Sequence, residues 1–515
     1  MTDTPWWKTG IVYQIYPRSY QDSNGDGIGD LRGIQSRLDH VASLGVDAIW
    51  ISPMFPSPMA DFGYDVSDYS GVGEMFGTME DFDALSEAIH ARGMKLILDF
   101  VPGHSSDRHP WFLESRASRE SPKRDWYVWR DPAPDGGPPT NWIAHFGGSA
   151  WEKDEATGQY YLHMFLKEQP NLNWRNPDLL NAMMDAMRFW YDRGVDGFRV
   201  DAFENVGADP DLGDNPPNPD WMPGKPETWQ FLQHATLHRP EVFDVAREMR
   251  RVAEEYDPPR VLIGEIYAPY PTLMRYYGDA LDAFQLPFNF MLLDTEWDAD
   301  RVADVIREYE SHLPEGGAPN WVLGNHDRPR FPTRYGYENA RAALMLLLTL
   351  RGTPTLYQGD ELGMENVPVP ADRIVDPWGH TMPEFGRDPM RTPMPWDDSA
   401  TVGFTTGEPW LPVGLPQGGS VSVQDGDPSS TLSLTRSLID LRRRSDALTR
   451  GEVGGVASED GVLRYERVGS DRRLGVAINF TDEPRPFPFD GETLLSTSPS
   501  PGDTLAPHEG RIVRL

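Results

Sequence analysis

The chain contains no cysteine among its 515 residues. Disulfide frameworks and thiolate metal centres are therefore excluded. Basic residues are also scarce, since 47 lysines and arginines stand against 80 aspartates and glutamates, a formal net charge of -33 at pH 7. A chain with this charge repels phosphate groups and anionic lipid, so we expect neither nucleic acid nor a membrane surface as a partner.

Long apolar runs are missing as well. The longest, "AALMLLLTL" near Ala342, is much shorter than the roughly 20 residues that cross a bilayer as a helix. The first residues, "MTDTPWWKTG", lack the basic stretch and apolar run of a secretory signal. We therefore expect a cytoplasmic protein. Its 39% of hydrophobic residues is enough to bury a large core.

One local pattern recurs along the chain: an amphipathic stretch, a glycine, and a short apolar strand. It is seen in "VASLGVDAIWISP", "AIHARGMKLILDFVPGH" and "MRFWYDRGVDGFRVDAF", with Gly45, Gly93 and Gly194 at the junctions. A glycine there suits the left-handed residue that ends a helix. Strands that are apolar throughout are typical of parallel sheets covered on both faces.

Five further strands of this kind bring the number to eight, which predicts an α/β fold, a (β/α)8 TIM barrel. An open doubly wound sheet is the alternative, but "IYPRSYQDSNGDG" after the first strand lacks its glycine-rich phosphate turn. We expect the barrel in residues 1–103 and 174–447, an inserted subdomain after strand three in residues 104–173, and an antiparallel β-domain in residues 448–515.

Polar side chains follow five of the predicted strands. In a (β/α)8 barrel these strand ends form the catalytic face. The residues are Asp61, Tyr64, Asp99, His104, Arg199, Asp201, Glu265, His326 and Asp327. Any one of the acids could be an ordinary cap or turn residue. Three clustered carboxylates without compensation would cost stability, so a functional site is the better interpretation.

Two carboxyl groups that flank an acetal are the equipment of glycoside hydrolysis, in which one attacks and the other donates a proton. Arg199 lies two residues before Asp201, so both point to the same side of a strand. We expect its positive charge to keep Asp201 ionised, as a nucleophile requires, with Glu265 as the general acid. His104, His326 and Asp327 would bind sugar hydroxyls.

At these residues the sequence resembles the α-amylase-type glycoside hydrolases, in the branch of α-glucosidases and oligo-1,6-glucosidases. The matching segments occur in family order between residues 10 and 397. They are "GIVYQIYPRSYQDSNGDGIGDLRGI", "GYDVSDY", "DFVPGHSSDRHPWF", "QPNLNWRNP", "GVDGFRVDAF", "LIGEIY", "GNHDRPR" and "GRDPMRTPMPWD".

The resemblance implies a retaining mechanism, with Asp201 as nucleophile, Glu265 as acid/base and Asp327 as the third acid. It places Tyr64 under the sugar ring and gives His104, Arg199 and His326 to its hydroxyls. Asp61 and Arg387 match a pair that closes the pocket in exo-acting members. The implied substrate is a small α-glucoside from whose non-reducing end glucose is released, with transglycosylation as a side activity and no organic cofactor.

The residue after the nucleophile is associated with linkage in this branch. Ala202 stands there, which favours α-1,4 links such as maltose over the α-1,6 links of an oligo-1,6-glucosidase. Trehalose synthases and sucrose isomerases are relatives that return the glucosyl group to the released sugar, and the sequence does not separate them from hydrolases. A non-catalytic relative is disfavoured because all three carboxylates are present.

The segment "DSNGDGIGD" predicts a structural metal site. Oxygen ligands at Asp22, Asn24, Asp26 and Asp30, with the Ile28 carbonyl between, suit Ca²⁺ or Mg²⁺. An Asp/Gly-rich turn without an ion is the alternative. The family's other calcium site depends on an Asn where this chain has Gly103, so no calcium is expected between the barrel and the insert.

Overall fold

A computed structural model describes residues 4–470 and 472–515, and its centre is an eight-stranded parallel sheet. The strands are β1 (Val12–Ile15), β2 (Ala48–Ile51), β3 (Lys95–Phe100), β7 (Gly197–Val200), β8 (Val261–Gly264), β9 (Leu286–Pro287), β10 (Asn320–Val322) and β11 (Thr353–Tyr357). They pair in this order, and β11 returns to β1. A parallel bridge between Asn289 and Trp321 joins β9 to β10 and closes the barrel. The predicted (β/α)8 barrel is confirmed.

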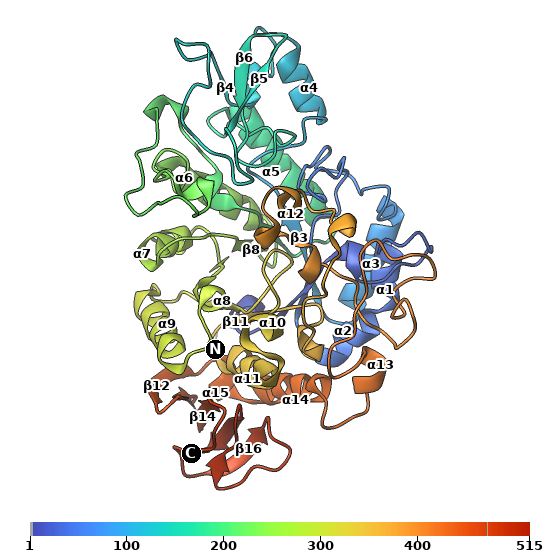
Figure 1. Ribbon diagram of the computed structural model, residues 1–515, viewed down its shortest axis with the longest axis vertical. Coiled ribbons are helices and arrows are strands. Elements are labelled where there is room, and N and C mark those ends of the chain that lie inside the picture. Colours follow the sequence, from blue (N-terminus) through green and yellow to red (C-terminus); the bar gives the residue numbers. More distant parts are fainter. Residues whose placement is uncertain (1–3, 471) are drawn as a thin grey trace.

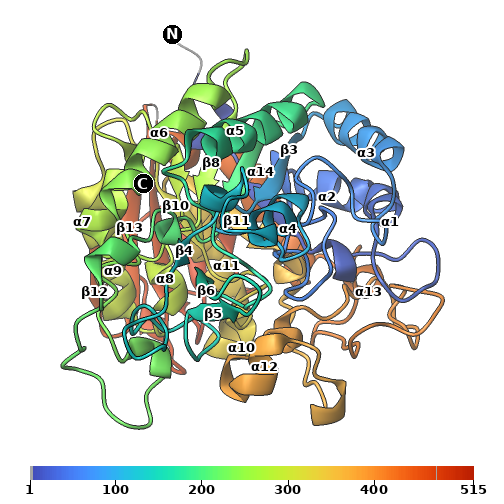
Figure 2. The ribbon, with the colours of Figure 1, turned by 90° about the horizontal axis from the view of Figure 1, so that it is seen from above.

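Helices surround the barrel (Figure 2). They are α1 (Leu31–Ser36), α2 (Leu38–Leu44), α3 (Met79–Ala91), α5 (Pro177–Asp192), α6 (Pro240–Ala253), α7 (Tyr270–Leu273), α8 (Met291–Asp294), α9 (Ala299–His312), α10 (Phe331–Tyr335) and α11 (Ala340–Thr349). Gly45, Gly93 and Gly194 have φ values of 86°, 76° and 92°, so the predicted left-handed residues are confirmed.

Helix α5 illustrates how the sequence forms these elements. Asn176 caps it through its side chain and Pro177 occupies the first turn, where its missing N–H costs no hydrogen bond. Met183, Met187 and Trp190 lie on its buried face at helical spacing. The capping and the apolar stripe together fix the start of the helix and the face that packs on the barrel.

Two antiparallel sheets flank the barrel, the insert at the top of Figure 1 and the C-terminal sheet at the bottom. The insert contains α4 (Pro110–Ala117), β4 (Trp129–Arg130), β5 (Trp151–Asp154) and β6 (Gln159–Leu162). The C-terminal sheet contains β12 (Glu452–Glu459), β13 (Val462–Val468), β14 (Arg473–Asn479), β16 (Glu492–Ser496) and β18 (Gly510–Arg514), and β15 (Arg485–Pro486) pairs β17 (Thr504–Leu505) beside it. These elements fall within the expected ranges, while the domain boundaries themselves stay a prediction.

Two long excursions at the catalytic face were not foreseen. Residues 201–239, between β7 and α6, contain the short 3-10 helices η4 (Phe203–Asn205), η5 (Pro210–Leu212) and η6 (Glu227–Trp229). Residues 358–430, between β11 and α14, contain α12 (Pro377–Thr381), η11 (Pro383–Phe385), η12 (Asp388–Met390) and α13 (Val421–Gln424). Helices α14 (Thr431–Arg444) and α15 (Asp446–Thr449) then lead to the C-terminal sheet. Within the described ranges, no helix combines the length and the apolarity needed to cross a membrane.

Candidate active site

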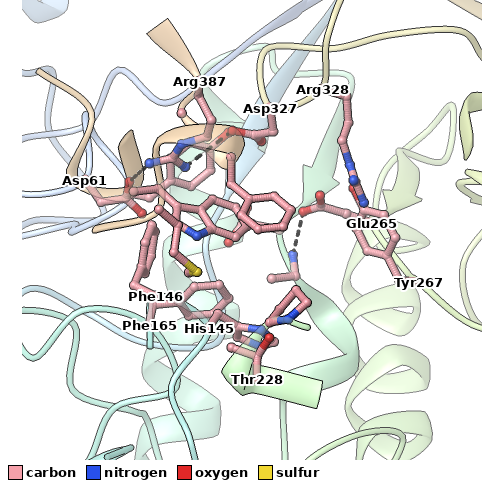
Figure 3. Close-up of a pocket in the computed structure, with 18 of the residues that line it drawn as sticks. Asp61, His145, Phe146, Phe165, Thr228, Glu265, Tyr267, Asp327, Arg328 and Arg387 are labelled. Atoms are coloured by element: carbon pink, nitrogen blue, oxygen red, sulfur yellow. Dashed lines mark hydrogen bonds and ion pairs between the residues drawn. The ribbon is translucent and has the colours of Figure 1, made fainter. Parts of the chain in front are cut away.

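A cavity of about 730 Å³ opens where the barrel strands end. It brings together the predicted Asp61, Tyr64, His104, Asp201, Glu265, Asp327 and Arg387. The two unforeseen excursions supply much of the remaining wall, from Ala202 to Leu237 and from Asn366 to Met390. Figure 3 shows Asp61, Arg387 and Asp327 grouped on one side, and Glu265 with Tyr267 and Arg328 on another.

Arg199 lies behind this wall and is almost wholly buried. Its Nη1 donates to Asp99 Oδ1 at 2.7 Å and to Asp201 Oδ1 at 2.9 Å, and its Nη2 donates to Glu265 Oε2. One guanidinium therefore holds both carboxyl groups that the sequence analysis predicts to react. Because the two terminal nitrogens of a guanidinium are neighbours in a rigid plane, the carboxyl groups of Asp201 and Glu265 are held side by side.

The charge state of Asp201 differs from the sequence-based expectation. Burial raises the pKa of its carboxyl well above the usual range, and although Arg199 opposes this, Glu265, Asp99 and Asp327 add to the rise. The pKa of Asp201 is therefore shifted in the direction opposite to the one expected from Arg199. Burial is the main cause, and the single guanidinium offsets it only in part because it is shared with Glu265 and with Asp99, whose pKa burial raises to about 7.

The backbone N–H of Ala202 points toward the carboxyl group of Glu265. Its backbone is left-handed, with φ of 38° and ψ of 44°, an uncommon conformation for a residue with a Cβ. In this conformation its N–H donates to Glu265 Oε2 at 2.9 Å, a contact drawn in Figure 3. The backbone strain at Ala202 is thus linked to the placement of the Glu265 carboxyl at the end of β8.

Two arginines and one histidine surround the carboxyl group of Asp327. Arg391 Nη2 donates to its Oδ1 at 2.5 Å, Arg387 Nη1 lies 3.4 Å from the same atom, and His326 Nε2 lies 3.1 Å from Oδ2. Burial works against ionisation, but these groups outweigh it and hold the pKa of Asp327 well below its usual range. Asp327 is therefore a fixed negative charge in the wall.

A third residue, the buried Asp376, also contacts the Asp61–Arg387 pair. Arg387 Nη2 donates to Asp61 Oδ1 at 2.7 Å and to Asp376 Oδ1 at 2.7 Å. Asp376 additionally accepts from the Nε and the backbone N–H of Arg387. Asp376 is fully buried, so the direction of the Arg387 guanidinium is fixed from behind.

Tyr64 and His104 line the cavity, and His326 lies against the ring of Tyr64. The rings of Tyr64 and His326 stack with centroids 5.6 Å apart. His104 Nε2 lies 3.1 Å from the Tyr64 carbonyl oxygen, and burial lowers the pKa of His104 to about 4, so it is neutral. His326 and Arg199 are buried beneath the cavity wall, at 0% and 1% exposure, and their contact with sugar hydroxyls stays a prediction.

Several residues of the site were missed from the sequence. Gln169 Nε2 lies 3.0 Å from His104 Nε2 and 3.2 Å from Asp61 Oδ2. Gln169 and Arg391 are both part of segments that carried the family resemblance, so the resemblance could have indicated them. Asp376 and Glu204 had no comparable signal, because they belong to the irregular excursions.

The loop that was predicted to bind a metal ion is held together by hydrogen bonds between its side chains and its backbone. Asp22 Oδ1 accepts from the N–H groups of Asn24 and Gly25, both at 2.8 Å, and Asp26 Oδ1 accepts from Ile28 N–H at 2.8 Å. Asp30 caps α1 through Gly33 N–H. The donor types suit a hard cation. Among the residues that the structure describes, however, no group of three or more acidic or histidine side chains forms a metal-binding arrangement.

Comparison with known proteins shows the family of the chain. Residues 14–451 match the family model of the α-amylase catalytic domain, and residues 449–512 match a domain of unknown function. A probable α-glucosidase of Rhizobium meliloti is 42% identical, covering 93% of this chain and 90% of the relative. An oligo-1,6-glucosidase of Parageobacillus thermoglucosidasius is 38% identical, covering 96% and 93%.

Solved structures match over the whole chain. The structure of an α-glucosyl transfer enzyme, XgtA, has a TM-score of 0.93 at 39% identity and covers 99% of this chain and 100% of that one. A MutB variant in complex with its substrate sucrose has a TM-score of 0.90 at 37% identity, covering 99% of both chains. This chain therefore belongs to the α-amylase family, as a glycoside hydrolase of the α-glucosidase type.

Proposed function

We propose that the protein is a retaining, exo-acting α-glucosidase that releases glucose from maltose and other short α-glucosides. The observation that carries the proposal is the binding of Asp201 and Glu265 to one guanidinium, that of Arg199. Retaining enzymes need their two carboxyl groups close together, at about 5–5.5 Å, whereas inverting enzymes need room for a water between them.

The reaction would proceed in two displacements. Asp201 attacks the anomeric carbon while Glu265 gives its proton to the glycosidic oxygen, and the aglycone leaves. Glu265 then takes a proton from water, which attacks the glucosyl-Asp201 intermediate and releases glucose. The pair must hold one proton at the start. The raised pKa of Asp201 and the single cation shared by the acids are consistent with a pair that retains one proton.

Exo action is supported by the Asp61–Arg387 ion pair at 2.7 Å. Both residues line the cavity, and Asp376 fixes the guanidinium from behind. A terminal glucose has hydroxyl groups that such paired charges can bind, whereas a chain continuing past this end would have to break the pair. Asp327, Tyr64, His104, Arg199 and His326 are proposed to distort or hold the same glucose.

The linkage proposal depends on Ala202 alone. The preference proposed is α-1,4, with α-1,6 as the alternative because an oligo-1,6-glucosidase is among the similar proteins. The second candidate function is intramolecular transfer of the glucosyl group, favoured by the likeness to XgtA and to MutB with sucrose. Transfer differs from hydrolysis in how well the site retains the released sugar and excludes water.

The first experiment is time-resolved proton NMR of the protein with maltose and, separately, with isomaltose. Early α-glucose from maltose is the expected result, and faster release from isomaltose would replace the α-1,4 proposal while leaving the mechanism intact. Early β-glucose would contradict retention. A new disaccharide in place of glucose would favour transfer.

Asp201→Asn tests the nucleophile. We expect kcat to fall by at least about 10⁴-fold, because an amide cannot form the glucosyl ester. Thermal unfolding should show a folded variant, since Asn keeps the shape of the side chain. Turnover at the wild-type rate would exclude Asp201 as the nucleophile.

The metal prediction concerns Asp22, Asn24, Asp26, Ile28 and Asp30. If Ca²⁺ or Mg²⁺ binds this loop, chelation with EDTA should lower the Tm and added Ca²⁺ should restore it, because a ligand that binds only the folded state stabilises it. The Asp26→Asn variant should lose that response. A Tm that is independent of EDTA and Ca²⁺ would support a turn held by hydrogen bonds alone.

A further inference from the structure

Glu204 is a buried acid in the cavity wall that the proposed mechanism does not use. It belongs to η4, three residues after Asp201, and its side chain lines the cavity although the residue is only 6% exposed. Its Oε2 atom is buried and has no hydrogen-bond partner within the described part of the chain. A buried polar atom without a partner is costly, and a bound group that supplies the hydrogen bond would remove this cost.

The groups that face Glu204 come from several elements. Glu265 follows β8 and Arg199 lies on β7, while Tyr267 and Tyr276 lie on the segment after β8. Burial raises the pKa of Glu204 to about 8, Glu265 adds to the rise, and the backbone amides of Glu204 and Tyr267, together with Arg199, oppose it. At neutral pH the side chain is thus a carboxylic acid, with an O–H to donate and an oxygen to accept.

The position of Glu204 relates it to the leaving group. Asp61 and Arg387 close one side of the cavity, whereas Glu204, Asn205, Thr228 and Gln233 belong to the excursion between β7 and α6. Glu204 lines the same cavity as Glu265, the proposed proton donor to the glycosidic oxygen. Because the Asp61–Arg387 pair would close the end that holds the terminal glucose, we expect the departing sugar to lie along the remaining wall, to which Glu204 belongs.

We propose that Glu204 is a specificity-determining residue whose carboxylic acid hydrogen-bonds a hydroxyl group of the departing sugar. The inference rests on the proposed function, because it requires a sugar that leaves beside Glu265. It assigns the departing group to the chemical class of polyhydroxylated sugars. An aglycone without hydroxyl groups leaves Glu204 unpartnered and gains nothing from it.

The test compares Glu204→Ala with wild type on maltose and on 4-nitrophenyl α-glucoside, whose aglycone carries no hydroxyl group. We expect the ratio of kcat/KM for maltose to kcat/KM for the aryl glucoside to fall by about tenfold or more, the value of one buried hydrogen bond. Glu204→Gln, which keeps a donor and an acceptor, should recover most of that ratio. Asp220→Asn, an exposed acid on the same excursion, is the matched control and should leave it unchanged.

Each outcome has a distinct meaning. An equal loss on both substrates would overturn the proposal, because Glu204 would then act through Glu265 and not on the departing sugar. An unchanged ratio in a folded Glu204→Ala variant would overturn it as well. If wild-type protein itself releases no glucose from either substrate, the proposed function fails, and this is seen before any variant is compared. Should Glu204→Ala not fold, Glu204→Met takes its place in the same comparison with the Asp220→Asn control, because it keeps most of the side-chain volume but has no hydrogen-bond donor.

Discussion

The two sides of the cavity differ in how their charges are paired. On one side Arg387 joins Asp61 and Asp376 at 2.7 Å each, and Asp327 is held by Arg391 and Arg387. On the other side Glu265 is paired with Arg199, whereas the Oε2 atom of Glu204 has no partner among the described residues. Trp229, which is 56% exposed, also lines the cavity.

Because of this difference, the two sides of the cavity can recognise different parts of a substrate with different strictness. Charges fixed by buried partners need no rearrangement when a substrate arrives, so they favour one sugar in one orientation. The neutral carboxylic acid of Glu204 and the exposed indole of Trp229 restrict the orientation of a ligand less. The comparison predicts strict recognition of the terminal glucose and broader tolerance of the departing group. Three experiments test this contrast between the two sides.

The largest effect is expected from Asp376→Asn. The substitution keeps the side-chain shape but removes the charge that fixes Arg387 through three contacts. We expect kcat/KM for maltose to fall by about 10- to 100-fold, because a buried guanidinium loses its partner and its direction. Steady-state kinetics with maltose, with the Tm as a measure of folding, would check this.

The control for that variant is Asp425→Asn, which removes the exposed partner of Arg436 at 2.6 Å. Surface pairs contribute little, so no change in kcat/KM is expected there. Wild-type kinetics in a folded Asp376→Asn protein would show that Arg387 holds its place without Asp376, and the contrast between the two sides would lose its physical basis.

An intermediate effect concerns stability against pH. The carboxyl of Glu204 has a pKa of about 8 in the folded protein against an ordinary value of 4.5, so the folded state binds its proton more tightly. Between these values the unfolded chain has released the proton and the folded protein has not, so stability falls as pH rises through this window. The Glu204→Gln variant has no titrating carboxyl group at this position, so it should not lose stability in this way as the pH rises.

The measurement is the Tm of wild type and of Glu204→Gln from about pH 4.5 to about pH 8. The difference, variant minus wild type, should grow with pH. Asp360, whose pKa burial also raises to about 7, is present in both proteins and cancels in the difference. A difference that stays constant with pH would mean that Glu204 is already ionised in the folded protein.

The smallest effect is expected from Trp229→Ala. The indole lines the cavity but is more than half exposed, so it can stack on a sugar beyond the departing one. We expect KM for maltotriose to rise by about two- to tenfold while KM for maltose changes less. Kinetics with both sugars would check this, and equal changes would place Trp229 beside the departing sugar itself.

Much of the fold, and much of the part of the site proposed to bind the terminal glucose, could be predicted from the sequence alone. Runs of apolar residues after Gly45, Gly93 and Gly194 determined the barrel strands, because buried parallel strands and helix ends have local signatures. Strand direction then placed Asp201, Glu265 and Asp327 on one rim, since side chains at the ends of parallel strands meet on the same face.

The charge pairing in the site and the side of the cavity that contains Glu204 and Trp229 could be described only from the tertiary structure. The sequence placed Arg199 beside Asp201 but could not show that Asp99 and Glu265 share the same guanidinium. It gave no sign that Asp376 lies behind Arg387 or that Glu204 enters the wall. The physical reason is that pKa values and contacts depend on burial and on distances between excursions far apart in the chain, for which irregular segments carry no periodic signal.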